Sequence, residues 1–208
     1  MYKLEQPAMA VNDPRVSVGK AQDLFTRRFQ MWDTWDIRAG EPRQDILNRV
    51  AAVARKAPGG RLRHLVLNCR TLPAYLQLGE GFDRSHLPLF EAWRGLIDKI
   101  WIPDCEVAQI PDAVLQERLD RDHPGLNTGN GNLFCSGLAK TVYSYVVAPT
   151  ELQNDTTSTY PAGEMPGFKG LVLSYGPDGY VTCSRKSPFA WLDKYGEQTR
   201  RLYAATGQ

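Results

Sequence analysis

Short apolar runs that alternate with amphipathic segments constrain the fold of this chain more than any other feature. The apolar runs have the length and composition of strands that are buried in a sheet. The amphipathic segments carry apolar residues at steps of three and four, as a helix requires. This alternation predicts an α/β fold with a mainly parallel central sheet and helices on both faces. In chain order the segments are the helix 45–56, the strand 64–69, the helix 89–97, the strand 99–103, the helix 132–142 and the strand 145–148.

The ends of the chain complete a single domain over residues 1–208. Residues 1–14 carry no clear pattern, and we expect them to form a flexible lead-in. Residues 170–183 contain two apolar runs that flank Gly176-Pro177-Asp178-Gly179, which predicts a C-terminal β-hairpin. Residues 188–208 have the composition of a C-terminal helix.

Three other segments are assigned from composition and local pattern. A second short strand is expected at 74–78, and the highly charged segment 111–122 predicts an exposed or mobile helical insertion. Residues 15–37 fit a strand at 16–18 and a short helix at 24–32, but the pattern does not settle either.

Charge and hydropathy exclude several classes of protein. The chain has 208 residues with 25 Lys and Arg against 23 Asp and Glu, which leaves a net charge of +2. This near-balance argues against a dedicated nucleic-acid or polybasic membrane surface. The sequence contains no apolar run of the roughly 18–20 residues that a membrane span needs, and residues 1–13 lack the apolar core of a signal peptide. We therefore expect a cytoplasmic protein, with delivery by a signal-peptide-independent secretion system as the alternative.

Cysteine and histidine spacing gives no sign of a metal or cofactor. The four cysteines form no C-x-x-C pair, and the three histidines lack zinc-ligand spacing, so we expect reduced thiols and no metal. No phosphate-binding G-x-x-x-x-G-K-[ST] loop is present. The run Gly129-Asn130-Gly131-Asn132 precedes a helix, where a loop-and-cap role is favoured over an anion cradle. No cofactor is expected.

Chemistry in a parallel sheet gathers beyond the carboxyl ends of the strands. In this sequence those positions are residues 69–71, 104–106 and 149–151. Cys105 stands out because it directly follows an apolar strand, where a thiol can face a cleft. A nucleophilic cysteine needs an adjacent base or a lowered pKa. The alternative is a small buried residue at the end of a strand, which is common for cysteine.

Four blocks of the sequence resemble caspase-like cysteine peptidases of the clostripain and caspase group, and more closely uncharacterised bacterial domains with that fold. The blocks, which fall within residues 60–175, are HLVLNCRTLPAYLQLGEGF (64–82), IWIPDCEVAQI (100–110), GNLFCSGLA (131–139) and YVVAPTE (145–151). The resemblance implies a three-layer sandwich. It also implies a catalytic His-Gly at the end of one core strand and a nucleophilic Cys at the end of the next.

Carried over residue by residue, the resemblance places Cys105 at the nucleophile position, Arg70 at the histidine position and Thr71 at the glycine position. The chain departs from the family here, because a guanidinium stays protonated at physiological pH and cannot accept the thiol proton. Arg70 can still hold a thiolate by its charge. The cleft implied by the resemblance is lined by Cys69, Thr71, Asp104, Glu106, Thr150 and Glu151.

No histidine replaces the missing base in an obvious way. His64 begins the strand that Arg70 follows, and six residues at ~3.3 Å each place it about 20 Å away. His86 and His123 lie in expected loop regions and are more typical of surface residues. A disulfide between Cys69 and Cys105 under oxidation is an open alternative, which depends on whether the fold brings the two thiols within bonding distance.

Three functional hypotheses follow. The first is a bacterial pseudoenzyme, a caspase-like module that binds a protein or peptide in the former cleft, with Arg70 and Glu106 as recognition charges. The second is an active cysteine hydrolase, of effector or self-processing type, that uses Cys105 with a relocated base. The third is a structural domain of a larger assembly. The sequence does not indicate an oligomeric state.

Overall fold

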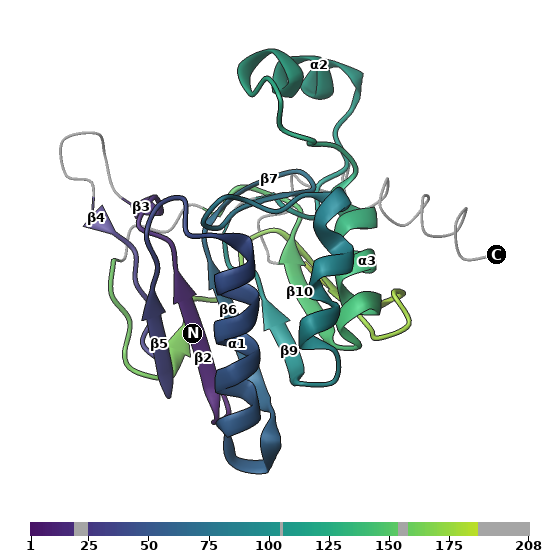
Figure 1. Cartoon of the computed structure of the whole chain (residues 1–208). Helices are drawn as coiled ribbons and strands as arrows, with labels where there is room; N and C mark the ends of the chain where they lie inside the picture. The colour runs from purple at the N-terminus through teal and green to yellow at the C-terminus, as the bar shows by residue number, and fades with distance from the viewer. Residues whose placement is uncertain (19–24, 105, 154–157, 187–208) are drawn as a thin grey trace.

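A seven-stranded sheet with the order β13-β12-β10-β9-β6-β2-β5 forms the centre of the protein (Figure 1). The computed structural model describes residues 1–18, 25–104, 106–153 and 158–186. Strands β5, β2, β6, β9 and β10 run parallel, whereas β12 and β13 are each antiparallel to their neighbours. The expected α/β class with a mainly parallel central sheet is therefore confirmed. In chain order the strands are β2 (Ala8–Asn12), β5 (Asp33–Asp36), β6 (Leu62–Asn68), β9 (Ile97–Trp101), β10 (Tyr145–Pro149), β12 (Leu171–Tyr175) and β13 (Val181–Lys186).

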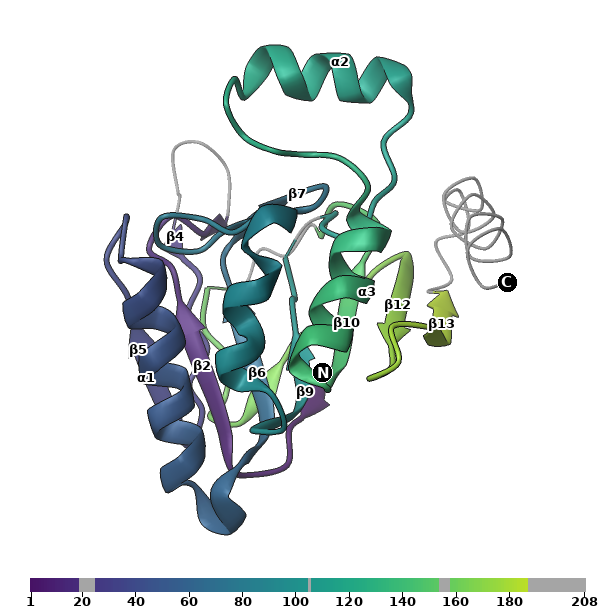
Figure 2. The ribbon, with the colours of Figure 1, turned by 45° about the vertical axis from the view of Figure 1, so that its right-hand side comes forward.

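Three helical segments lie side by side on one face of this sheet: α1 (Arg43–Lys56), the 3₁₀ helix η2 (Arg84–Trp93) and α3 (Gly131–Val142) (Figures 1 and 2). Trp93, which is fully buried, links two of them, because its Nε1 donates a hydrogen bond to the Leu47 carbonyl at 2.9 Å. The helix expected at 45–56 is confirmed, with a buried apolar face at the steps of three and four seen in the sequence. That face consists of Ile46, Leu47, Val50, Ala51, Val53 and Ala54.

The opposite face is covered by extended segments. A two-stranded ribbon of β1 (Tyr2–Lys3) and β11 (Glu164–Met165) lies on this side, and its Met165 joins side chains of β2, β6 and the connecting segments in a second, smaller core. Within the described residues no helix contributes to this core, which differs from the helices expected on both faces. The side chains that form it are Leu4, Ala8, Ala10, Phe29, Val66, Tyr160 and Met165.

The N-terminal segment is part of the fold, and the expectation of a lead-in over residues 1–14 is wrong. β2 pairs with both β5 and β6, and all five of its residues are buried. Met9 and Val11 face the helices, whereas Ala8 and Ala10 face the second core. A strand buried on both faces lacks the polar alternation that identifies a half-exposed strand. Its two alanines also have low β-propensity, so the sequence signal was weak.

Other boundaries differ locally. The strand expected at 74–78 is β8 (Tyr75–Gln77), which pairs with β7 (Arg70–Leu72) in a separate hairpin and not in the central sheet. The helix expected at 89–97 is a 3₁₀ helix that contains Pro88, a residue that removes a backbone donor. Residues 25–32 contain β4 (Phe25–Thr26), which pairs with β3 (Ser17–Val18), and no helix.

The insertion and the C-terminal hairpin match the sequence pattern. α2 (Ala113–Asp122) projects beyond the sheet on two connecting loops (Figure 2), and most of its residues are exposed. β12 and β13 form the expected hairpin. The helix expected at 188–208 lies outside the described residues. Among the residues that are described, no helix is long and apolar enough to cross a membrane.

The run Gly129-Asn130-Gly131-Asn132 forms the cap of α3. The Asn130 side chain accepts a hydrogen bond from the Leu133 N–H at 3.0 Å, and the Gly131 N–H donates to the Gln109 carbonyl at 2.8 Å. A Cβ on Gly131 would collide with the carbonyl oxygens of Val107 and Gln109. These backbone groups are satisfied within the protein, which supports the cap role over an anion cradle.

Asn130→Ala is expected to lower the free energy of unfolding by about 1 kcal/mol, because the Leu133 N–H loses its acceptor. Urea denaturation measures the change. Asn127→Ala, at an exposed loop position three residues earlier, is the control and should leave stability within ~0.5 kcal/mol. Equal effects of the two substitutions would contradict the capping role.

Candidate functional site

The carboxyl ends of β2, β6 and β9 lie at one edge of the sheet because these strands are parallel neighbours. The chain passes from β2 outward to β5 and then returns to β6 on the other side of β2. Such a reversal of strand order leaves a crevice beyond the strand ends, and ligands of open α/β sheets bind there. β2 ends in Asn12 and β6 ends in Asn68, so two amides meet at this point.

A buried hydrogen-bond network joins these two amides to the segment that follows β2. Asn68 Nδ2 donates to Asn12 Oδ1 and to the Arg27 carbonyl, both at 2.8 Å. Asn12 also exchanges hydrogen bonds with the backbone of Phe29, at 3.0 Å in each direction. The network fixes residues 27–29 against the sheet edge and satisfies polar groups that have no access to water.

Arg27 is the buried cation at this edge. Its Nη2 lies 3.2 Å from Asp104 Oδ1, and the two side chains are 1% and 9% exposed. Its Nε donates to Asn68 Oδ1 at 3.2 Å, whereas Nη2 makes no hydrogen bond of good geometry. Asp104 directly precedes Cys105 in the chain. The residue that precedes the expected nucleophile in the chain is therefore a carboxylate paired with a buried guanidinium.

A second ion pair braces the neighbouring loop. Asp13 is fully buried and accepts hydrogen bonds from Arg15 Nε at 2.8 Å and Nη2 at 2.6 Å. The Gly79 N–H donates to the same carboxylate at 2.9 Å, and Arg15 Nη2 donates to the Gly79 carbonyl at 2.7 Å. This arrangement ties the end of β2 to the turn after β8.

Cys69 and Thr71 are enclosed by these groups. Burial raises the pKa of the Cys69 thiol well above its ordinary value, with Asp104 and Asp13 adding to the effect and Arg15 and Arg27 opposing it. Cys69 is therefore an inert, protonated thiol at neutral pH. Thr71 is 5% exposed, and its hydroxyl donates to the Asp104 carbonyl at 3.4 Å. The structure brings Cys69, Thr71 and Asp104 together at this edge, and all three are buried.

The remaining expected site residues lie in different environments. Arg70 is exposed and lies on β7, opposite Gln77. Thr150 is fully buried and bonds back to the Leu171 carbonyl, and Glu151 Oε1 accepts from the Leu171 N–H at 3.1 Å. These last two side chains therefore support β12.

Glu106 has an unusual environment for a carboxyl group. Its Oε2 is buried without a hydrogen-bond partner among the described residues. Burial raises the pKa of Glu106, and the Asp104 charge acts in the same direction, while Arg118 opposes it. A raised pKa makes this carboxylate a stronger proton acceptor than an ordinary glutamate.

Cys105 lies outside the described residues, and so does its half of the expected disulfide with Cys69. Cys69 and Cys135 are both buried free thiols. Among the described residues, no group of three or more His, Cys, Asp or Glu side chains has the geometry to hold a metal ion.

The three imidazoles have defined places. His64 accepts a hydrogen bond from Trp101 Nε1 at 3.1 Å through Nδ1. His86 belongs to the cap of η2, where its Nδ1 lies 2.9 Å from Asp83 Oδ1. His123 is the residue that ends α2.

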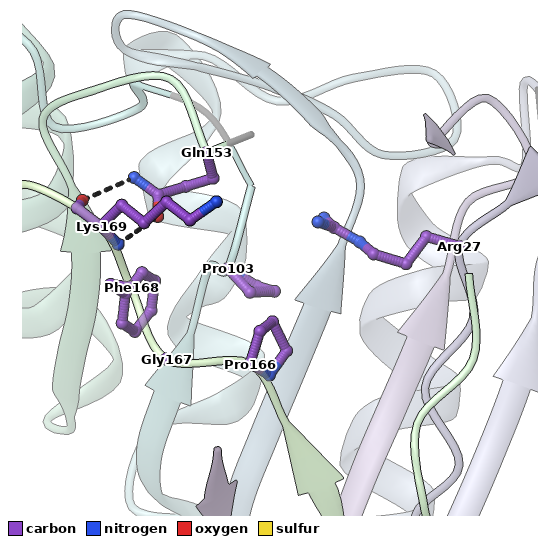
Figure 3. Close-up of a pocket in the computed structure, with 7 residues that line it drawn as sticks. All are labelled: Arg27, Pro103, Gln153, Pro166, Gly167, Phe168 and Lys169. Atoms are coloured by element: carbon purple, nitrogen blue, oxygen red, sulfur yellow. Dashed lines mark hydrogen bonds between the residues drawn. The ribbon is translucent and has the colours of Figure 1, made fainter. Parts of the chain in front are cut away.

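A cavity of about 100 Å³ opens beside this network (Figure 3). Arg27 points into it from one side, and Gln153 and Lys169 lie on the other, joined by two hydrogen bonds of 3.0 and 2.8 Å. The residues that line this cavity are Arg27, Pro103, Gln153, Pro166, Gly167, Phe168 and Lys169.

Comparison with known proteins adds no relative to this description. No known protein family, curated protein or solved structure matches the chain.

Sequence reasoning missed most of this site. None of the cavity-lining residues was expected there, and neither was Asn12 or Asn68. One signal was present: Asn12-Asp13-Pro14 follows an apolar run, as polar residues do at the end of a buried strand. The interpretation of residues 1–14 as a lead-in concealed it.

Proposed function

We propose that this chain is a caspase-like module without peptidase activity that binds a peptide segment of a partner protein at the carboxyl edge of the sheet. The ion pair of Arg27 with Asp104 carries the proposal. A cysteine peptidase needs a proton acceptor beside its thiol. The buried group that pairs with the residue preceding Cys105 is instead a guanidinium, which holds its proton at physiological pH.

Two observations on the imidazoles support the same conclusion. His64 and His86 are hydrogen-bonded to Trp101 and Asp83, and these bonds fix their rings in other roles. The topology also supports the caspase-like expectation, since β6 and β9 are parallel neighbours whose carboxyl ends precede Arg70 and Cys105.

The cavity indicates the chemistry of the partner. Arg27 and Lys169 line it, and no carboxylate does among the described residues. Its volume of about 100 Å³ suits one side chain and not a whole ligand. We infer that an acidic side chain of the bound peptide enters this cavity, where charge-assisted hydrogen bonds favour a carboxylate over an amide.

Peptide pools with one fixed position test this preference. Acetylated hexapeptides that carry Asp or Glu at the fixed position should bind about tenfold more tightly than pools with Asn or Gln. Lys169→Gln should remove most of that difference, and Lys140→Gln, an exposed lysine on α3, should not. Isothermal titration calorimetry measures both. Equal affinities for the acid and amide pools would rule out the acidic partner.

Thiol-dependent cleavage tests the absence of activity. The purified chain should leave fluorogenic peptide pools intact, and Cys105→Ala should bind the acidic pool as the wild type does. Cleavage that Cys105→Ala abolishes would overturn the proposal.

Glu106 favours a second candidate function, an active cysteine hydrolase. Its raised pKa and its position next to Cys105 in the chain suit it as a relocated proton acceptor. This function requires rapid labelling of Cys105 by iodoacetamide at neutral pH, slowed by Glu106→Gln. Labelling no faster than in the unfolded chain would exclude it.

A further inference from the structure

A larger groove of about 500 Å³ lies at the opposite end of the sheet, against the amino ends of β6, β9 and β10. It occupies the face that carries no described helix, beside the β1 ribbon. Its volume falls within the range of small-molecule sites. None of the features assigned to the peptide site contributes to it.

Strand register places the side chains of the groove floor in two rows. His64, Lys99 and Tyr145 are directly paired across β6, β9 and β10. In the next row on the same face Trp101 pairs with Val66 and Val147. Alternate residues of a strand share a face, so Lys99 and Trp101 lie together on the groove side.

Lys99 contributes a positive charge between aromatic rings. Its Nζ lies 5.3 Å from the centre of the Trp101 ring and 5.9 Å from that of Tyr145. Two carboxylates also line the groove, those of Glu5 and Asp98, and Asp98 pairs with Arg61 and Arg63. In the described part of the chain no carboxylate lies within ion-pair distance of Lys99. Tyr145 is 42% exposed and lies beside this charge.

His64 adds a hydrogen-bond donor to the same row. Burial lowers its pKa to about 4, with Lys99 and Arg63 acting in the same direction and Glu5 and Asp98 opposing them. The ring is therefore neutral at pH 7. Because Nδ1 accepts from Trp101, the proton lies on Nε2. The groove thus combines a cation with no ion-pair partner among the described residues, a neutral donor and an exposed tyrosine.

We propose that this groove binds a nucleoside monophosphate, with the phosphate at Lys99 and the base against Tyr145. The phosphate supplies the anion that Lys99 lacks, and stacking on Tyr145 suits any base because every base has a π-face. Lys99 Nζ and the centre of the Tyr145 ring are 5.9 Å apart, a distance that a ribose spans. This site is independent of the peptide site at the other edge.

Calorimetry with AMP, GMP, CMP and UMP tests the proposal, with adenosine and inorganic phosphate as the two partial ligands. At least one nucleotide should bind about tenfold more tightly than either partial ligand. Lys99→Gln and Tyr145→Ala should each weaken binding by about tenfold. The matched controls Lys140→Gln and Tyr180→Ala, at exposed positions outside the groove, should bind as the wild type does.

A second readout excludes a purely structural role of Lys99. The bound phosphate offsets the cation that lowers the His64 pKa, so saturation with nucleotide should raise that pKa in NMR titrations of the ring. Binding of phosphate alone with equal affinity, or no nucleotide binding at 1 mM, would overturn the proposal. The proposal would also be overturned if the groove bound an acidic peptide and no nucleotide, and if Lys99→Gln abolished that peptide binding. Lys169→Gln should leave nucleotide binding intact. A failure of the nucleotide proposal can therefore be distinguished from a failure of the peptide proposal.

Discussion

Arg27→Met is expected to lower the free energy of unfolding by about 3–5 kcal/mol, the largest effect of any single substitution discussed for this chain. The Arg27 and Asp104 side chains are only 1% and 9% exposed. Removing the guanidinium leaves the Asp104 carboxylate in a site with little water and no counter-charge from Arg27. It also removes a hydrogen bond to Asn68 Oδ1. Urea denaturation at pH 7 measures the loss.

Arg28→Met is the matched control, because Arg28 is the next residue and also pairs with an aspartate. Its side chain and that of Asp36 are 40% and 54% exposed, so water screens this pair. Exposed ion pairs contribute about 0–1 kcal/mol. A loss for Arg27→Met no greater than that for Arg28→Met would show that the buried pair does not stabilise the sheet edge.

The double variant separates the loss of a partner from the loss of the pair. If the cost of Arg27→Met arises from a buried carboxylate that has lost its guanidinium, Arg27→Met with Asp104→Asn should recover part of the stability. Arg27 also lines the cavity of the peptide site, so its loss should affect peptide binding as well as stability. We expect the double variant to fold and to lose its preference for acidic peptides.

Local patterns in the sequence predicted the helix layer and five of the seven strands of the sheet. α1 and β10 follow the expected segments closely because their signals are contained within a few consecutive residues. β2 was missed because a strand buried on both faces and rich in alanine lacks alternation. The sequence could not show which face would carry helices, since the second core is built from extended segments far apart in the chain.

The candidate site was predicted less well than the fold, for a physical reason. The strand ends at 69–71 and 104–106 were identified because a buried strand has a recognisable end. Arg27, however, reaches Asp104 across a tertiary contact, and no local pattern links the two residues. The sequence directed attention to Arg70, which is exposed, while the buried cation comes from a segment without a regular period. Lys99 is a similar case: it interrupts one face of an apolar strand, and it lies on the sheet face that carries no described helix, beside the groove.

His64 should make the protein lose stability as the pH falls from about 6.5 to about 4. Its pKa is lowered from 6.5 to about 4 in the folded protein, chiefly by burial and by Lys99. Between these values the unfolded chain binds the proton more readily than the folded one, so acid favours unfolding. The stability contribution is complete above pH 6.5. The upper bound is about 3 kcal/mol, and partial exposure of the ring reduces the expected loss to about 1–2 kcal/mol.

The comparison of wild type and His64→Gln isolates this effect, because glutamine removes the titrating group and keeps a possible acceptor for Trp101 Nε1. The difference in free energy of unfolding between the two should change by about 1–2 kcal/mol between pH 7 and pH 4, in favour of the variant at low pH. His123→Gln removes an imidazole at the end of α2 and serves as the control. Lys99→Gln should reduce the wild-type loss as well, since Lys99 is one cause of the lowered pKa. Parallel pH profiles for wild type and His64→Gln would mean that the ring is protonated equally easily in the folded and the unfolded state, which would contradict the lowered pKa of His64.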